Sequence, residues 1–220
     1  MQIKERYIQG LRGYQIDNFY SHPEFILNHI ISTPPHIHGS AELPGSKNGR
    51  EYSDMRHKKP LPELKYYEDI IIDLIGVPVV PAWADECPGR SPLETNFMQW
   101  RDTPYNDFYN NYWWPHYDRG WTTIIYLNHE TTNGTNIYED IDNYFQDVQV
   151  PNYTELLNPW QPKKHYKLVD YLEPAFNRAY IFQSGKLMHS AAVDDKTYFE
   201  QGGLYRLNQV MFFDEVEKDG

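Results

Sequence analysis

The pattern of hydrophobic and polar positions predicts short strands far more often than helices. Residues 122–127 (TTIIYL) form an apolar run whose first half is β-branched, which is typical of a buried strand. Several other short runs of β-formers are bounded by Gly, Pro or polar turn residues. They predict strands at residues 14–20, 77–83, 95–101, 135–138, 178–183 and 205–213.

Two segments have helical spacing instead. Apolar residues recur every three or four positions over residues 60–75, at Leu64, Tyr67, Ile71 and Leu74, and Gly76 and Pro78 follow as stop signals. Earlier in the chain, Ser21 and Glu24 have the spacing of a capping box. We therefore expect a short helix to about residue 31, with Phe25 and Ile30 buried.

Strands that follow one another without βαβ alternation predict a mainly β (α+β) fold. We expect a double-stranded β-helix, a cupin-like jelly roll, with N-terminal helices packed on one side. The length of 220 residues suits a single domain. Within it, residues 1–100 would hold the helices and supporting strands, and residues 112–214 the jelly-roll core. The polar, proline-broken residues 139–174 would be an insertion, and residues 33–56 a loop.

Composition excludes several classes of function. The net charge of −11 argues against a protein that coats nucleic acid or an anionic membrane, because both need a basic face. Cys87 is the single cysteine, so no internal disulfide forms, which suits a reducing compartment. The first ten residues lack the apolar core of a signal peptide, and no apolar run reaches membrane-spanning length. We therefore expect a cytoplasmic protein.

The strongest chemical motif lies just before the apolar strand. His116 and Asp118 are two residues apart, and on an extended chain such positions face the same side. An imidazole and a carboxylate are two of the three ligands in a 2-His-1-carboxylate iron site, which leaves open positions for substrate and dioxygen. Taken alone, the pair is equally well explained by a hydrogen-bonded histidine next to an acid.

A second histidine and an arginine follow on late strands. His189 comes after an apolar strand and a turn, and Arg206 begins the last strand. An arginine is costly to bury unless it meets an anion, and its guanidinium fork matches a carboxylate. If Arg206 faces the interior, a diacid or a similar anion is its expected ligand. On a strand, Leu204 would face the same side as Arg206 and Leu207 the opposite side. Because both sides then carry a leucine, the pattern does not show which way Arg206 points.

These residues together resemble the iron(II)/2-oxoglutarate-dependent dioxygenases, in particular their prolyl-hydroxylase-like branch. That branch has a His-x-Asp motif, a strand ending in Tyr-Leu-Asn, a glycine-containing turn, an aromatic strand leading to a second His, and an Arg on the final strand. The matching segments here are His116-Tyr-Asp118, residues 122–128 (TTIIYLN), Asn133-Gly134-Thr135, residues 180–182 before His189, and residues 206–213 (RLNQVMFF).

The resemblance implies a role for each matching residue. His116, Asp118 and His189 would bind Fe(II) as the catalytic centre. Arg206 would pair with the distal carboxylate of 2-oxoglutarate, with Tyr126 and Asn208 assisting. The implied activity is hydroxylation of a C–H bond of a peptide side chain or small molecule by dioxygen, with release of succinate and carbon dioxide.

Two other functions stay open from the residues alone. One is a jelly-roll module that binds a metal or ligand without turnover, and the other is a metal-dependent hydrolase that uses the same three ligands with zinc. A diacid anchor such as Arg206 favours the oxygenase, because a hydrolase does not need one.

Some further residues have a chemical and a structural interpretation. Tyr112, Trp113 and Trp114 would line a substrate entrance or belong to the core. His129 and His165 are rival third ligands, but neither precedes a strand that carries an arginine. His36 and His38 lie in a Pro-rich segment that favours a solvated loop.

Overall fold

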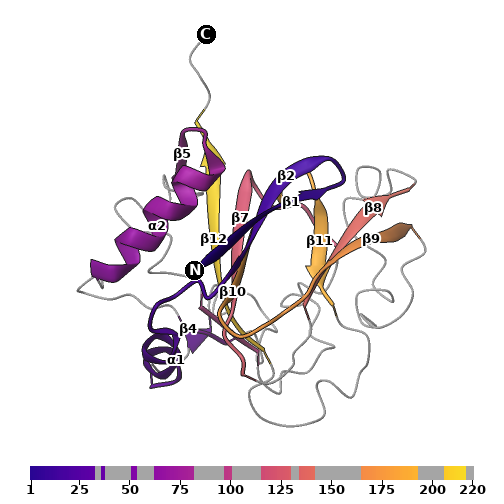
Figure 1. The fold of residues 1–220 in the computed structure, drawn as a ribbon. Helices are drawn as coiled ribbons and strands as arrows, with labels where there is room; N and C mark the ends of the chain where they lie inside the picture. The colour runs from indigo at the N-terminus through magenta and orange to yellow at the C-terminus, as the bar shows by residue number, and fades with distance from the viewer. Residues whose placement is uncertain are drawn as a thin grey trace.

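A computed structural model of the chain describes residues 1–32, 36–37, 51–53, 62–81, 97–100, 115–129, 134–141, 165–192 and 206–216. These residues form two antiparallel sheets and two helices (Figure 1). The helices lie on one side of the larger sheet, at the left of the view, and the smaller sheet lies on the other side.

The larger sheet has nine strands in the described part of the chain. Its main path runs β1-β2-β10-β7-β12-β6-β4-β3, and β5 also pairs with β12. The bounds are β1 Gln2–Ile8, β2 Leu11–Asp17, β3 His36–Ile37, β4 Glu51–Ser53, β5 Val79–Pro81, β6 Phe97–Trp100, β7 Trp121–Tyr126, β10 Arg178–Phe182 and β12 Arg206–Glu215. Strand β7 lies between β10 and β12, so the Tyr-Leu-Asn strand of the sequence motif is central in this sheet.

The smaller sheet has three strands in the order β11-β8-β9. They are β8 Thr135–Asp140, β9 Tyr166–Leu172 and β11 Met188–Ala191. Ile137 and Leu172 of this sheet share one buried cluster with Ile124, Tyr180 and other residues of the larger sheet. The two sheets therefore face each other across a common core, which is the jelly-roll-like arrangement expected from the sequence.

The opposite face of the larger sheet packs on the helices α1 (Pro23–Ser32) and α2 (Pro62–Ile75). Strand β7 shows how alternation separates the two cores. Trp121 and Ile125 belong to the core that includes Ile71 of α2, whereas Ile124 and Tyr126 belong to the core between the sheets. Helices packed on one side of the sheet were also expected.

Local predictions succeed where the period is strong. Helix α2 was expected at residues 60–75, and Tyr67 and Ile71 are buried as its spacing indicated. Helix α1 also forms, but the prediction that Phe25 is buried is wrong, because Phe25 is exposed and Ile26 and Leu27 are buried instead. The hydroxyl of Ser21, expected to cap α1, accepts a hydrogen bond from Tyr67 of α2 at 3.1 Å.

Several strands were missed, β1 and β9 among them. β1 (QIKERYI) carries mostly exposed polar residues because it is an edge strand paired only with β2 in the described sheet. β9 lies within residues 139–174, which were interpreted as an insertion, and it pairs with β8 across a register shift at Ile137 and Tyr138. The predicted loop 33–56 contains the short strands β3 and β4, and its remaining residues lie outside the described part. No helix in the described ranges is both long and apolar enough to span a membrane.

Candidate metal centre

The backbone brings His116 and His189 together although they are far apart in the sequence. His189 lies in β11, and its backbone forms an isolated antiparallel bridge with His116, with N–O distances of 3.0 and 2.9 Å in the two directions. Asp118 follows two residues after His116. One ligand atom from each of His116, Asp118 and His189 lies within 4.8 Å of the other two.

The separations of these atoms suit a single cation. His189 Nε2 is 2.9 Å from Asp118 Oδ2, and His116 Nε2 is 3.7 Å from Asp118 Oδ1. Ligand atoms about 2.1 Å from a metal and at right angles to each other are about 3 Å apart. These two separations, with all three ligand atoms within 4.8 Å of one another, are of the size that a single shared cation requires.

A hydrogen bond at His189 Nδ1 determines which ring nitrogen is left to face Asp118. His189 Nδ1 is 2.9 Å from the carbonyl oxygen of Leu187, a contact that requires Nδ1 to carry the proton. In a neutral ring the Nε2 lone pair then points at the Asp118 carboxylate, and two lone pairs 2.9 Å apart repel unless a proton or a cation lies between them. Either a proton on Nε2 or a cation resolves this contact, and a cation bound there would find the histidine oriented by the backbone carbonyl, as in known metal sites.

The surroundings keep Asp118 ionised. Its side chain is 17% exposed and that of His189 is 8% exposed. Burial by itself raises the pKa of Asp118, but the hydrogen bond and charge of His189, with a further contribution from His116, outweigh it and hold the pKa below the ordinary value. A carboxylate that is ionised at neutral pH is ready to bind a cation.

Two loops meet closely beside Asp118. The Asp118 N–H donates to the Ser184 carbonyl at 3.3 Å, and the Gly185 N–H donates to the Gly120 carbonyl at 2.9 Å. Gly120 has a positive φ of 49°, and a Cβ there would lie 2.1 Å from the Phe213 carbonyl oxygen. A Cβ on Gly185 would lie 2.9 Å from Gly120 N, so both glycines are needed for this approach.

The residues expected to bind the keto acid lie on adjacent strands. Tyr126 pairs with Asn208 of β12 on one side and with Arg178 of β10 on the other. Tyr126 is fully buried, and its hydroxyl is 2.8 Å from Thr135 Oγ1 and 3.4 Å from the Leu172 carbonyl oxygen. Asn208 is 1% exposed, and its Oδ1 has no hydrogen-bond partner among the described residues. Arg206 is placed by its backbone, which pairs with Trp100 of β6, and its side chain lies outside the described residues.

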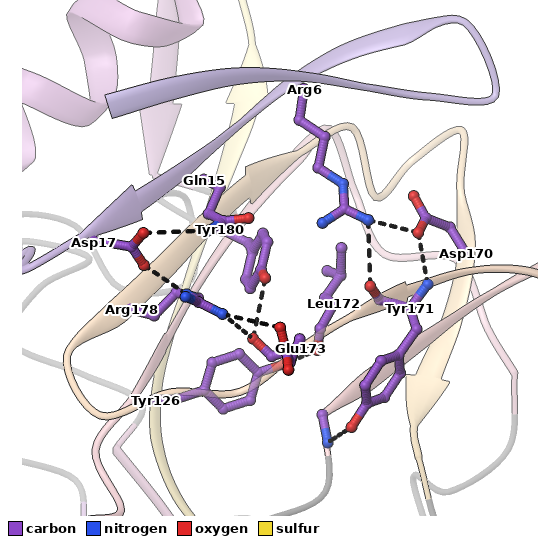
Figure 2. A network of polar contacts seen from close by, with 11 residues as sticks. Arg6, Gln15, Asp17, Tyr126, Asp170, Tyr171, Leu172, Glu173, Arg178 and Tyr180 are labelled. Atoms are coloured by element: carbon purple, nitrogen blue, oxygen red, sulfur yellow. Dashed lines mark hydrogen bonds and ion pairs between the residues drawn. The ribbon is translucent and has the colours of Figure 1, made fainter. Parts of the chain in front are cut away.

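Figure 2 shows a polar network that holds β9 against the larger sheet. Arg6 of β1 bonds Asp170 Oδ1 at 2.5 Å and the Tyr171 carbonyl at 3.2 Å. Tyr180 of β10 donates to the Glu173 carbonyl at 3.0 Å, beside the Tyr126 contact to Leu172. Sequence reasoning missed this network because its members come from several segments far apart in the sequence, and no local pattern signals their pairing.

The rival ligand histidines lie elsewhere. His129 Nε2 is 2.9 Å from Glu24 Oε1, and its ring stacks on Phe176 at 3.8 Å. Within the described ranges, neither His129 nor His165 joins the cluster formed by His116, Asp118 and His189. The predictions for Cys87, His38 and residues 112–114 fall outside the described residues, as does the side chain of His36.

Comparison with known proteins leaves the family open. No model of a known protein family matches the sequence, and no curated protein matches it. Among solved structures, the chain is similar to a prolyl-4-hydroxylase from Pseudomonas putida, with 10% sequence identity, a TM-score of 0.45 and coverage of 93% of both chains. A TM-score this low does not support an argument about function. The function must therefore be inferred from the side chains of this chain.

Proposed function

We propose that this chain is an Fe(II)- and 2-oxoglutarate-dependent oxygenase that hydroxylates a C–H bond. The observation that carries the proposal is the convergence of His116, Asp118 and His189, with their ligand atoms within 4.8 Å of one another. Two imidazoles and one carboxylate are the ligand set typical of non-haem Fe(II) oxygenases. Three protein ligands leave about three octahedral positions for other molecules.

The carboxylate ligand favours hydroxylation over halogenation. In the resembling family, members that halogenate lack this acid and place a halide at its position. Here Asp118 is present, largely buried and held ionised. It would occupy a coordination position that a halide would otherwise need.

Adjacent strands support a site for the keto acid. On a regular strand, positions 206, 208 and 210 of β12 share a face, and Val210 packs in the core between the sheets. We propose that Arg206 faces the same core and pairs with the distal carboxylate of 2-oxoglutarate, because a guanidinium in such a place needs an anion. Tyr126 and Asn208 would assist. The amide oxygen of Asn208 has no hydrogen-bond partner among the described residues, and rotation of the amide would put its NH2 group there to donate to a carboxylate.

The protein residues hold and shield the reactants. When bound, the iron supplies the oxidising chemistry, in which dioxygen, the keto acid and the substrate C–H group yield succinate, carbon dioxide and the hydroxylated substrate. The Leu187 carbonyl keeps the His189 ring oriented, and Phe182 packs edge-on against that ring at 5.2 Å. The apolar residues of the core between the sheets exclude water from the keto acid.

Anaerobic addition of Fe(II) and 2-oxoglutarate tests the proposal. We expect a visible charge-transfer band in the wild-type protein, its loss in His189→Ala, and its retention in His129→Ala, a histidine remote from the cluster. Succinate should then form when oxygen and a substrate are supplied.

Three outcomes would contradict the proposal. The absence of the band at saturating Fe(II) and keto acid would exclude a chelate at iron. Metal binding with no succinate under any condition would indicate a non-catalytic module. Activity with zinc in the absence of oxygen would indicate a hydrolase.

A further inference from the structure

Two buried hydroxyl groups lie behind the carboxylate of Asp118. Thr122 of β7 is 2% exposed, and Ser184, in the loop between β10 and β11, is fully buried. Their hydroxyl oxygens are 2.7 Å apart, and Thr122 Oγ1 is 3.4 Å from Asp118 Oδ2. The loop of Ser184 leads directly into the strand that carries His189. This hydroxyl pair therefore links the segment of Asp118 to the loop that precedes β11.

We propose that Thr122 and Ser184 form a hydroxyl relay that positions the Asp118 carboxylate for the metal. Both are positioning residues that act through Asp118 and do not themselves touch the metal. The inference rests on the proposed metal centre, but it does not depend on the identity of the keto acid or the substrate.

Each of the two hydroxyl groups has one proton to donate, so the hydrogen bonds of the relay can run in either of two directions. If Ser184 donates to Thr122, Thr122 donates to the Asp118 carboxylate. In the other direction, which the metal-free structure has, Thr122 donates to Ser184, and Ser184 donates to the carbonyl of Arg119 or Gly120, each 3.4 Å away. An ionised acceptor binds a donor more strongly than a neutral carbonyl does, so rotation of both hydroxyls toward Asp118 is favoured once a cation takes His189 away from Oδ2.

The relay has its main effect once the metal is bound. In the metal-free protein, His189 Nε2 lies 2.9 Å from the same Oδ2 atom that Thr122 approaches. A bound cation takes the Nε2 lone pair, so His189 stops serving as a hydrogen-bond partner of the carboxylate. Thr122 is then the described side chain that remains to orient Oδ2. Loss of its hydroxyl should therefore lower metal affinity more than it lowers the stability of the metal-free fold.

The next residue along β7 provides a matched control. Thr123 is also fully buried and also β-branched, but it faces the opposite side of the strand, and its Oγ1 has no hydrogen-bond partner among the described residues. Strand propensity and volume explain Thr123 without its hydroxyl. Thr122 and Thr123 thus share residue type, strand and burial, and they differ in their contact with Asp118.

Titration with Co(II) in a calorimeter tests the relay, with thermal unfolding of the metal-free proteins measured alongside. Thr122→Val should weaken Co(II) binding by about 10- to 100-fold, the usual effect of removing a partner of a metal ligand. Thr122→Ser should bind within about 3-fold of wild type, because it keeps the hydroxyl, and Thr123→Val should bind as wild type does. Ser184→Ala should show a smaller loss than Thr122→Val, because Thr122 can still donate to Asp118.

The results separate the relay from the metal centre itself. Wild-type protein that fails to bind Co(II), or binds equally well after Asp118→Asn, would contradict the proposed centre. Normal Co(II) binding by Thr122→Val, or an equal loss in Thr123→Val, would overturn the relay while leaving the centre intact. If Thr122→Val does not fold, unchanged binding by Ser184→Ala would overturn the relay instead.

Discussion

Replacement of Tyr126 by Phe separates a structural role from a role in ligand binding at one residue. The Tyr126 hydroxyl joins the two sheets through Thr135 Oγ1 at 2.8 Å and the Leu172 carbonyl at 3.4 Å. The hydroxyl carries one proton. To donate to a keto acid, Tyr126 must direct that proton toward the carboxylate while Thr135 donates to the Tyr126 oxygen.

Both effects of Tyr126→Phe have an expected size. Loss of one buried hydrogen bond costs about 0.5–1.5 kcal/mol of unfolding free energy. For a chain of this length, that lowers the melting temperature by about 1–6 °C. If Tyr126 donates to 2-oxoglutarate, loss of a hydrogen bond to a charged group costs about 1.5–3 kcal/mol, which weakens keto-acid binding at least about tenfold.

Tyr180→Phe is the matched control. Tyr180 is also buried, and its hydroxyl donates to the Glu173 carbonyl, next to the Leu172 carbonyl that Tyr126 approaches. Both variants should show similar melting temperatures in thermal unfolding, whereas calorimetric titration with 2-oxoglutarate in the presence of Mn(II) should show weaker binding only for Tyr126→Phe. Equal keto-acid affinities would refute the ligand role of Tyr126, and an unchanged melting temperature would refute the inferred link between the sheets.

Three further predictions follow from the candidate site. Metal at about 100 times its dissociation constant should stabilise the wild type by about 2.7 kcal/mol, and Asp118→Asn should abolish this shift in thermal unfolding. Arg206→Ala should weaken 2-oxoglutarate binding by about 100-fold with metal affinity unchanged, while Arg119→Ala, at an exposed ion pair, should bind the keto acid normally in the same titration. The pKa of Asp118 in the folded protein is lower than its ordinary value of 3.8, so ionised Asp118 stabilises the metal-free fold fully above that value. This contribution is lost as the pH falls through the lower folded pKa. The melting temperature of the wild type should therefore fall more steeply below about pH 4 than that of Asp118→Asn.

The three residues of the candidate cluster could be named from the sequence because each carries a local signal. His116 and Asp118 have the two-residue spacing of an extended chain, and His189 follows an apolar strand and a turn. Their convergence depends on the backbone bridge between His116 and His189, which only the folded chain shows. The role of Arg206 stays a prediction, because the structure places its backbone alone.

Other parts of the site had no signal that a single sequence could provide. The hydroxyl groups of Thr122 and Ser184 are 62 positions apart, and threonine in a β-branched run reads as ordinary strand propensity. Strand β9 was hidden because most of its side chains are exposed or half-buried, so its residues show no apolar run. Pairing between distant segments is set by register and packing, which local composition does not record.

The two faces of strand β7 carry separate sets of side chains that a redesign of this protein could vary independently. Its odd-numbered side chains face the helices and pack in the core on that side. Its even-numbered side chains, including Thr122, Ile124 and Tyr126, face the other sheet. A library restricted to the even positions would vary the core between the sheets, beside the candidate metal centre, and leave the helix packing untouched. One short stretch of chain therefore gives separate access to the core under the helices and to the surroundings of the candidate site.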